Sequence, residues 1–202
     1  MKSSEVAELV RQLTSVDIAT ADVERCTKVL HGLSRVVAWA EARKIGVARQ
    51  LAALAVESPE ISPEHVVATA TRVSLGQAME PFKRATTIEA LPEFGEALVD
   101  GLVSAAHVDV VASAFAKLDD DGQRRFATRG EFLADVARRT TPGEFARTVR
   151  AEVLRTQRGD GLERLRRQQQ ATYLKTWVDQ ASGMWCLHGE FDPETGARLH
   201  NR

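Results

Sequence analysis

The 202-residue chain has few of the residues that brace small secreted or metal-dependent proteins. It contains two cysteines, Cys26 and Cys186, which lie far apart, so nothing in the sequence indicates a disulfide framework. No Cys-x-x-Cys pair occurs, which excludes the usual zinc knuckles.

Long apolar runs and catalytic signatures are also absent from the sequence. No apolar run approaches the roughly 20 residues of a membrane-spanning helix, and no signal-peptide pattern follows Met1. We therefore expect a cytoplasmic location and no membrane partner. The chain also lacks a glycine-rich phosphate loop, a Gly-x-Ser-x-Gly motif and a His-Glu-x-x-His motif. The sequence therefore predicts no catalytic residue, no cofactor and no metal.

Aromatic residues are scarce, at 5% of the chain, whereas hydrophobic residues reach 44%. The core must then be built largely from Ala, Val and Leu, which suits closely packed helices. The length is sufficient for one or two domains with a sizeable core.

The net charge of −1 conceals an asymmetry along the chain. Residues 56–121 carry 12 acidic and 4 basic residues, whereas residues 122–171 carry 12 basic and 6 acidic residues, and all 12 of those bases are Arg. Such a division can mark a nucleic-acid face or two solvated surfaces that attract each other. Without further observations, the second interpretation is the simpler one.

Periodicity and capping signals predict a mainly α fold, a multi-helix bundle with one long spine helix and a small C-terminal β-hairpin. A short helix capped by Ser74 and Gln77 is expected to kink or end at Pro81. The other helices are predicted over residues 5–13, 21–54, 63–72, 93–100, 105–118, 131–139, 141–156 and 162–170.

The longest periodic segment, residues 21–54, carries an apolar seam whose steps alternate between three and four residues. It could form a coiled-coil dimer, which would make the helix over residues 23–54 a homo-oligomer contact, or the spine of an antiparallel bundle. Gly32 and Gly46 each cost about 1 kcal/mol against Ala in an isolated helix, so we favour the bundle spine. Apart from Lys44, the seam comprises Val23, Cys26, Leu30, Leu33, Val37, Ala40, Val47, Leu51 and Leu54.

The pattern changes after residue 171, where two alternating segments flank a turn at Gly183. Asp192, Pro193 and Glu194 then open a helix. We therefore expect a helical domain over residues 1–170, followed over 171–202 by a β-hairpin and the start of a truncated helix. Four strand residues are expected to cap the helical core: Leu174, Val178, Trp185 and Leu187.

Two motifs suggest sites that their residue types do not support. The turn from Gly101 to Ser104 resembles that of a helix-turn-helix, but the helix after it has Lys117 as its only base, so we expect it to be buried. On that helix, His107 is more simply a satisfied core histidine than a ligand. Cys186 and His188 share a strand face, but their spacing from the acids and histidine that follow forms no recognisable metal site.

The helix over residues 141–156 has an apolar stripe of Phe145, Val149 and Val153, with arginines opposite. A row of guanidinium groups suits phosphate contacts, which give affinity for DNA without sequence choice. The alternative is a solvated face, with Glu144, Glu152 and Glu163 as partial partners. The candidate nucleic-acid-binding residues are Arg147, Arg150, Arg155, Arg158, Arg164, Arg166 and Arg167.

Four features of the sequence, taken in their order along the chain, carry a resemblance to a known family. They are the long helix rich in Arg and Ala, Leu91-Pro92 leading to the segment Gly101 to His107, the Thr141-Pro142 helix start, and the segment Gly183 to Ala197. In this order the sequence resembles domain of unknown function two-two-two, the thirteen-E-twelve repeat family. The resemblance implies the N-terminal region of proteins with an HNH endonuclease signature, and places catalysis in a closing HNH segment beyond this sequence.

The resemblance therefore carries over no catalytic residue. We expect a non-catalytic region of an HNH-endonuclease-like protein that associates with DNA through its Arg-rich helix. The alternatives are a helical protein-interaction or dimerisation module and an inert gene fragment.

Overall fold

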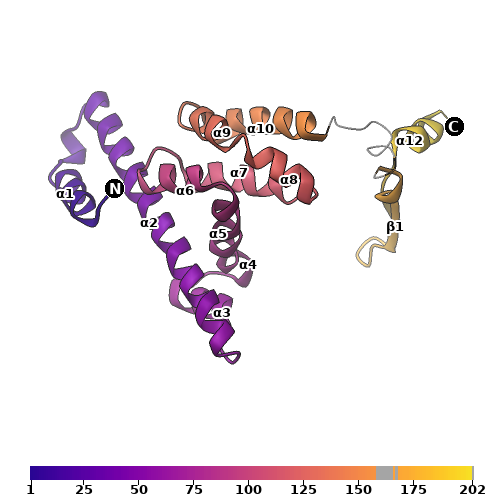
Figure 1. The fold of residues 1–202 in the computed structure, drawn as a ribbon, viewed down its shortest axis with the longest axis horizontal. Coiled ribbons are helices and arrows are strands. Elements are labelled where there is room, and N and C mark those ends of the chain that lie inside the picture. Colours follow the sequence, from indigo (N-terminus) through magenta and orange to yellow (C-terminus); the bar gives the residue numbers. More distant parts are fainter. Residues whose placement is uncertain (158–165, 167, 202) are drawn as a thin grey trace. The chain divides into compact units, whose positions relative to one another are not determined.

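A computed structural model describes residues 1–157, 166 and 168–201 of the chain. It confirms a mainly helical fold with a two-stranded sheet near the C-terminus (Figure 1). The chain divides into two compact units, Met1–Val153 and Leu154–Arg202.

The first unit consists of consecutive helices, the last of which, α10, continues into the second unit. The elements are α1 (Ser3–Thr14), a 3-10 turn (Ile18–Thr20), α2 (Val23–Glu57), α3 (Pro63–Thr71), α4 (Leu75–Ala78), α5 (Glu80–Ala90), α6 (Pro92–Val99), α7 (Ala105–Phe115), α8 (Asp120–Ala127), α9 (Gly130–Ala137) and α10 (Pro142–Gln157).

Helix α2 is the spine on which the first unit is built. It is 35 residues long and begins at Asp22, whose Oδ1 accepts a hydrogen bond from Arg25 N at 2.8 Å. Helices α1, α3, α5 and α6 pack against it. Figure 1 shows α1 beside its first half and α3 beside its second half.

The core lies on one side of α2 and continues through α5, α6, α7, α9 and α10. Small residues such as Ala38, Ala97 and Ala134 let the helices approach closely, as the composition predicted. The Phe94 and Phe145 rings meet with their centroids 5.9 Å apart. The largest fully buried side chains are Phe94, Phe126, Phe145, Leu91, Leu98, Leu133, Val108, Val111 and Val149.

Two helices, α5 and α8, were not predicted from the sequence. Pro81 does not end or kink the preceding helix, because α4 already stops at Ala78 and Pro81 lies in the first turn of α5. Proline is tolerated there because the first helical N–H groups have no intrahelical partner. Asp119 follows the end of α7 and also caps α8, since its Oδ1 accepts from Gly122 N at 2.8 Å.

Gly101 ends α6, as the sequence predicted. It also lets the turn that follows α6 lie close to α2. Its φ is +71°, a conformation that favours glycine. A Cβ at this position would lie 2.9 Å from the Arg35 Cβ and 3.0 Å from the Arg35 Cα. Glycine therefore meets both a conformational and a steric requirement here.

Helix α7 is a core element of the first unit. Val108 and Val111 are fully buried, and His107 is 6% exposed. Ser104 N donates to His107 Nδ1 at 3.2 Å, so the other ring nitrogen, Nε2, carries the proton and donates to the Thr140 carbonyl at 3.0 Å. The prediction of a satisfied core histidine is confirmed.

In the second unit, strands β1 (Tyr173–Val178) and β2 (Trp185–Glu190) pair antiparallel, in a register that joins Tyr173 to Glu190 and Val178 to Trp185. Helix α12 (Pro193–His200) follows. Its cap, Asp192, accepts from Glu194 N at 3.0 Å and from Thr195 N at 3.2 Å.

The register places Leu174, Val178, Trp185 and Leu187 on one face of the two-stranded sheet, and Tyr173 and Trp177 on the other. Leu174 is 55% exposed, Val178 44%, Trp185 73% and Leu187 69%. Within the second unit, two strands alone cannot cover this face, and the expected packing of these four side chains on the helical core stays a prediction.

Candidate functional site

An exposed apolar surface of the first unit runs along α2. Large side chains at heptad spacing face solvent: Leu30 is 62% exposed, Leu33 45%, Val37 59%, Val47 56% and Leu54 40%. Ala40 and Leu51 on the same face are half-buried, and Lys44 is exposed. Together these residues form the α2 stripe, which comprises Leu30, Leu33, Val37, Ala40, Lys44, Val47, Leu51 and Leu54.

The expectation that this seam would be the buried side of the bundle spine is therefore wrong. The residues of α2 that are buried are Val29, Gly32, Ala38, Ile45 and Ala48. Small residues carry the packing because they let α5 and α6 come close to the α2 backbone. The sequence signal for this second face is the spacing of Ala38, Ile45 and Ala48, which are separated by seven and three residues.

An ionic contact fixes the core side of α2 to its neighbours. Arg84 on α5 donates from Nε and Nη2 to the two carboxylate oxygens of Asp109 on α7, at 2.7 and 2.8 Å. Its Nη1 donates to Glu41 Oε2 on α2 at 2.8 Å. The Arg84 side chain is 13% exposed, and its hydrogen bonds to Asp109 raise its pKa above the ordinary value.

Helix α1 covers the other flank of α2. A Cβ at Gly32 would lie 2.7 Å from Leu13 Cδ2, so the missing side chain is what lets α1 dock. Gly32 is therefore a helix–helix contact and not a defect in the spine. Between α1 on one flank and the Arg84 contact on the other, the α2 stripe stays exposed.

The Arg-rich helix has the two faces that the sequence predicted. Phe145 and Val149 are buried, whereas Arg147 and Arg150 are exposed and lie three residues apart on α10. Arg155 is also exposed but takes part in an interaction. Arg166 is exposed, while Arg158, Arg164 and Arg167 lie outside the described residues.

Much of the positive charge around α10 is compensated locally. Arg124 and Arg125 pair with Asp121, and Arg138 pairs with Asp135. The buried Glu152 carboxylate lies 3.3 Å from Arg129 Nε, and the Arg129 guanidinium stacks 4.4 Å from the centre of the Phe132 ring.

Arg147 stands near Glu144, whose pKa is lowered mainly by hydrogen bonds from Thr141 and also by the Arg147 charge. Within the part of the chain that the structure describes, Arg150 makes no ion pair.

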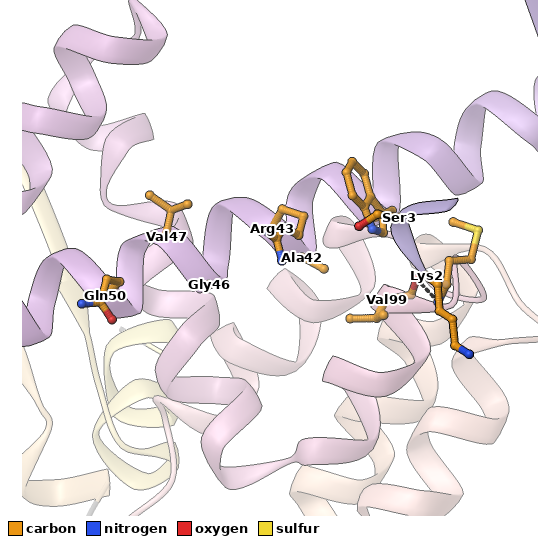
Figure 2. A pocket seen from close by; sticks show the side chains of 10 residues that line it. Lys2, Ser3, Ala42, Arg43, Gly46, Val47, Gln50 and Val99 are labelled. Atoms are coloured by element: carbon orange, nitrogen blue, oxygen red, sulfur yellow. Dashed lines mark hydrogen bonds between the residues drawn. The ribbon is translucent and has the colours of Figure 1, made fainter. Parts of the chain in front are cut away.

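A cavity of about 660 Å³ lies between the amino terminus, α2 and Val99. Figure 2 shows Val47 and Gln50 at one end of it and Lys2 and Val99 at the other. The Met1 ammonium donates to Asp100 Oδ1 at 2.7 Å and to the Val99 carbonyl at 3.1 Å. The lining holds no nucleophile–base pair and no acid–base pair, so it shows no catalytic constellation.

The described residues include no group of three or more His, Cys, Asp or Glu side chains that could hold a metal ion. Cys186 and His188 do share a strand face, but His188 Nδ1 lies 3.2 Å from the Tyr173 hydroxyl. No helix in the described part of the chain combines the length and the hydrophobicity needed to cross a membrane.

Comparison with known proteins gives one family. The family model described as Domain of unknown function (DUF222) matches residues 23–202, from the start of α2 to the last residue. No curated protein and no solved structure matches the chain.

Proposed function

The chain belongs to the DUF222 family, and on that premise we propose that it is a non-catalytic helical module that self-associates through the α2 stripe. The observation that carries the proposal is the exposure of Leu30, Leu33, Val37, Val47 and Leu54 along one face of the longest helix. Contiguous exposed apolar patches on a protein surface mark interaction sites.

The spacing distinguishes this face from the scattered hydrophobic residues that any surface carries. The steps of three and four residues keep the side chains on one line, which is the arrangement that a second helix packs against. Within the first unit, the hydrophobic core packs on the Ala-rich face of α2, and α1 docks on the other flank near Gly32. The exposed face is therefore available to another copy of the chain without any change in the core.

Light scattering across a range of protein concentrations tests this proposal. The mass should rise from the 22.2 kDa of one copy toward twice that value as the concentration increases. A mass of one copy at every concentration would overturn it.

A second candidate function is sequence-nonspecific contact with DNA. It is favoured by Arg147 and Arg150, which lie exposed on one face of α10 opposite the buried Phe145 and Val149. The resemblance to the N-terminal region of HNH-signature proteins supports the same candidate, because it would place this module beside a nuclease segment. The local pairing of the neighbouring arginines makes the supporting surface small.

Duplex binding measured at several salt concentrations tests the DNA candidate. Binding should weaken as salt rises, and Arg147→Ala with Arg150→Ala should reduce both the affinity and the salt dependence. Arg125→Ala with Arg138→Ala removes the same charge from arginines that are already ion-paired and serves as the control. The candidate fails if no binding occurs at low salt, or if the two double variants lose affinity equally.

A further inference from the structure

We infer that the partner on the α2 stripe is a second copy of this chain whose α2 runs antiparallel, with a two-fold axis near residue 42. The inference rests on the proposed self-association and adds the direction and register of the two helices. It follows from the positions of the stripe residues and from the charge of the one polar residue among them.

The stripe has the same spacing when it is followed from either end. Its steps from Leu30 to Leu54 alternate three and four residues, and begin and end with a step of three. An antiparallel copy therefore opposes apolar residues throughout the outer layers. These pairs are Leu30 with Leu54, Leu33 with Leu51, and Val37 with Val47, each formed twice across the axis.

Lys44 decides between the two directions. In a parallel, in-register pair, each stripe residue faces its own copy, so two Lys44 ammonium groups would meet in an apolar seam. In the antiparallel register, Lys44 faces Ala40 of the second copy, which leaves room for the lysine methylene groups. The next residue after Ala40 is Glu41, so the Lys44 charge approaches a carboxylate.

In the structure, the Glu41 carboxylate already forms ion pairs with two cationic side chains at this edge of α2. Lys44 Nζ of the same helix lies 2.8 Å from Glu41 Oε1, and Arg84 Nη1 lies 2.8 Å from Glu41 Oε2. The Glu41 carboxylate is thus held at the border between the core and the stripe. In the antiparallel pair, its Oε1 side is within reach of Lys44 from either copy, which supplies charge complementarity at the two-fold axis.

The length of the stripe matches what a helix pair requires. From Leu30 to Leu54, the helix rises about 36 Å, which allows layers of facing side chains along more than three heptads. The flanks are occupied by α1 near Gly32 and by the α5 contact near Glu41, and the exposed stripe runs between them.

Disulfide trapping tests the direction and register. In a background of Cys26→Ala and Cys186→Ala, two single-cysteine proteins are made, Val37→Cys and Val47→Cys. Each is oxidised alone, and an equal mixture is oxidised after time for subunit exchange. The antiparallel register predicts covalent dimers in the mixture and few in either protein alone.

Val37→Cys mixed with Val56→Cys serves as the off-stripe control, because Val56 is 83% exposed on the same helix. Covalent dimers from each single-cysteine protein alone, at the yield of the mixture, would show a parallel pair and overturn the inference. Light scattering of the same samples distinguishes a failure of the antiparallel register from a failure of the proposed self-association. A non-covalent dimer without mixed crosslinks contradicts the antiparallel register only, whereas a monomer contradicts the proposed function as well.

Discussion

Ile45 and Val47 lie two residues apart on α2 and have opposite surroundings, since Ile45 is 4% exposed and Val47 is 56% exposed. Successive residues of an α-helix are rotated by about 100°, so side chains two positions apart point to nearly opposite sides. Helix α2 therefore has two apolar faces. One face, rich in Ala, belongs to the core of this chain, and the other is open to a partner.

The contact between Arg84 and Asp109 predicts a large stability effect from a single surface-accessible residue. Asp109→Ala should lower the free energy of unfolding by about 1–3 kcal/mol, because the nearly buried Arg84 loses its two hydrogen bonds to Asp109 and keeps only the one to Glu41. Asp121→Ala removes a carboxylate that pairs only with exposed arginines, so it should cost no more than about 1 kcal/mol. Urea unfolding of the two variants checks the difference, and equal losses would contradict the role given to Arg84.

Two glycine substitutions should change stability in opposite directions. Gly101→Ala should destabilise the chain by about 1–3 kcal/mol, because its φ is positive and the new Cβ would press on Arg35 of α2. Gly46→Ala meets nothing within 4 Å inside a helix and should stabilise the chain by about 0.5–1 kcal/mol. Thermal unfolding followed by circular dichroism measures both. A destabilised Gly46→Ala would show that the exposed side of α2 is more crowded than described.

The cap of α12 should make the second unit sensitive to acid. The pKa of Asp192 is lowered, chiefly by a hydrogen bond from the Thr195 hydroxyl and also by backbone N–H donors. A lowered folded-state pKa means that the cap stabilises the unit above the unfolded pKa, near 3.9, and that this contribution is lost as the pH falls through the lower folded value.

An acid titration followed by NMR of the α12 amides should show this loss in the unmodified chain and not in Asp192→Ala, which lacks the cap at every pH. Identical titrations of the two proteins would contradict the assignment.

The sequence was sufficient for the elements whose ends carry strong chemical signals. The Gly101 stop and the Asp192 cap were readable because each places a specific acceptor or φ requirement at a helix end. Helices α5 and α8 were missed because Pro81 and the acidic run after Leu118 were interpreted as ends. Both are in fact first-turn residues, and the same residue types serve either role.

For a related reason, the sequence predicted the position of the candidate site but not its exposure. Hydrophobic periodicity located the α2 stripe but assigned it to the core, since periodicity reports an apolar face and not what covers it. The covering elements bind the neighbouring face through Ala38, Ile45 and Arg84, and only the three-dimensional arrangement shows this. For the Arg-rich helix, the exposed positions of Arg147 and Arg150 followed from the apolar stripe, but the pairing of the other arginines did not.

The proposed dimer depends on the α2 stripe, and the sedimentation of charge variants at high protein concentration tests it most directly. Leu33→Glu with Val47→Glu places carboxylates on stripe positions that are 45% and 56% exposed, so the fold should persist. Val56→Glu, on the same helix at 83% exposure, controls for added charge. The account predicts a dimer for the unmodified chain and for Val56→Glu, and a folded monomer for the stripe variant. A folded stripe variant that sediments as the same species as the unmodified chain would contradict it.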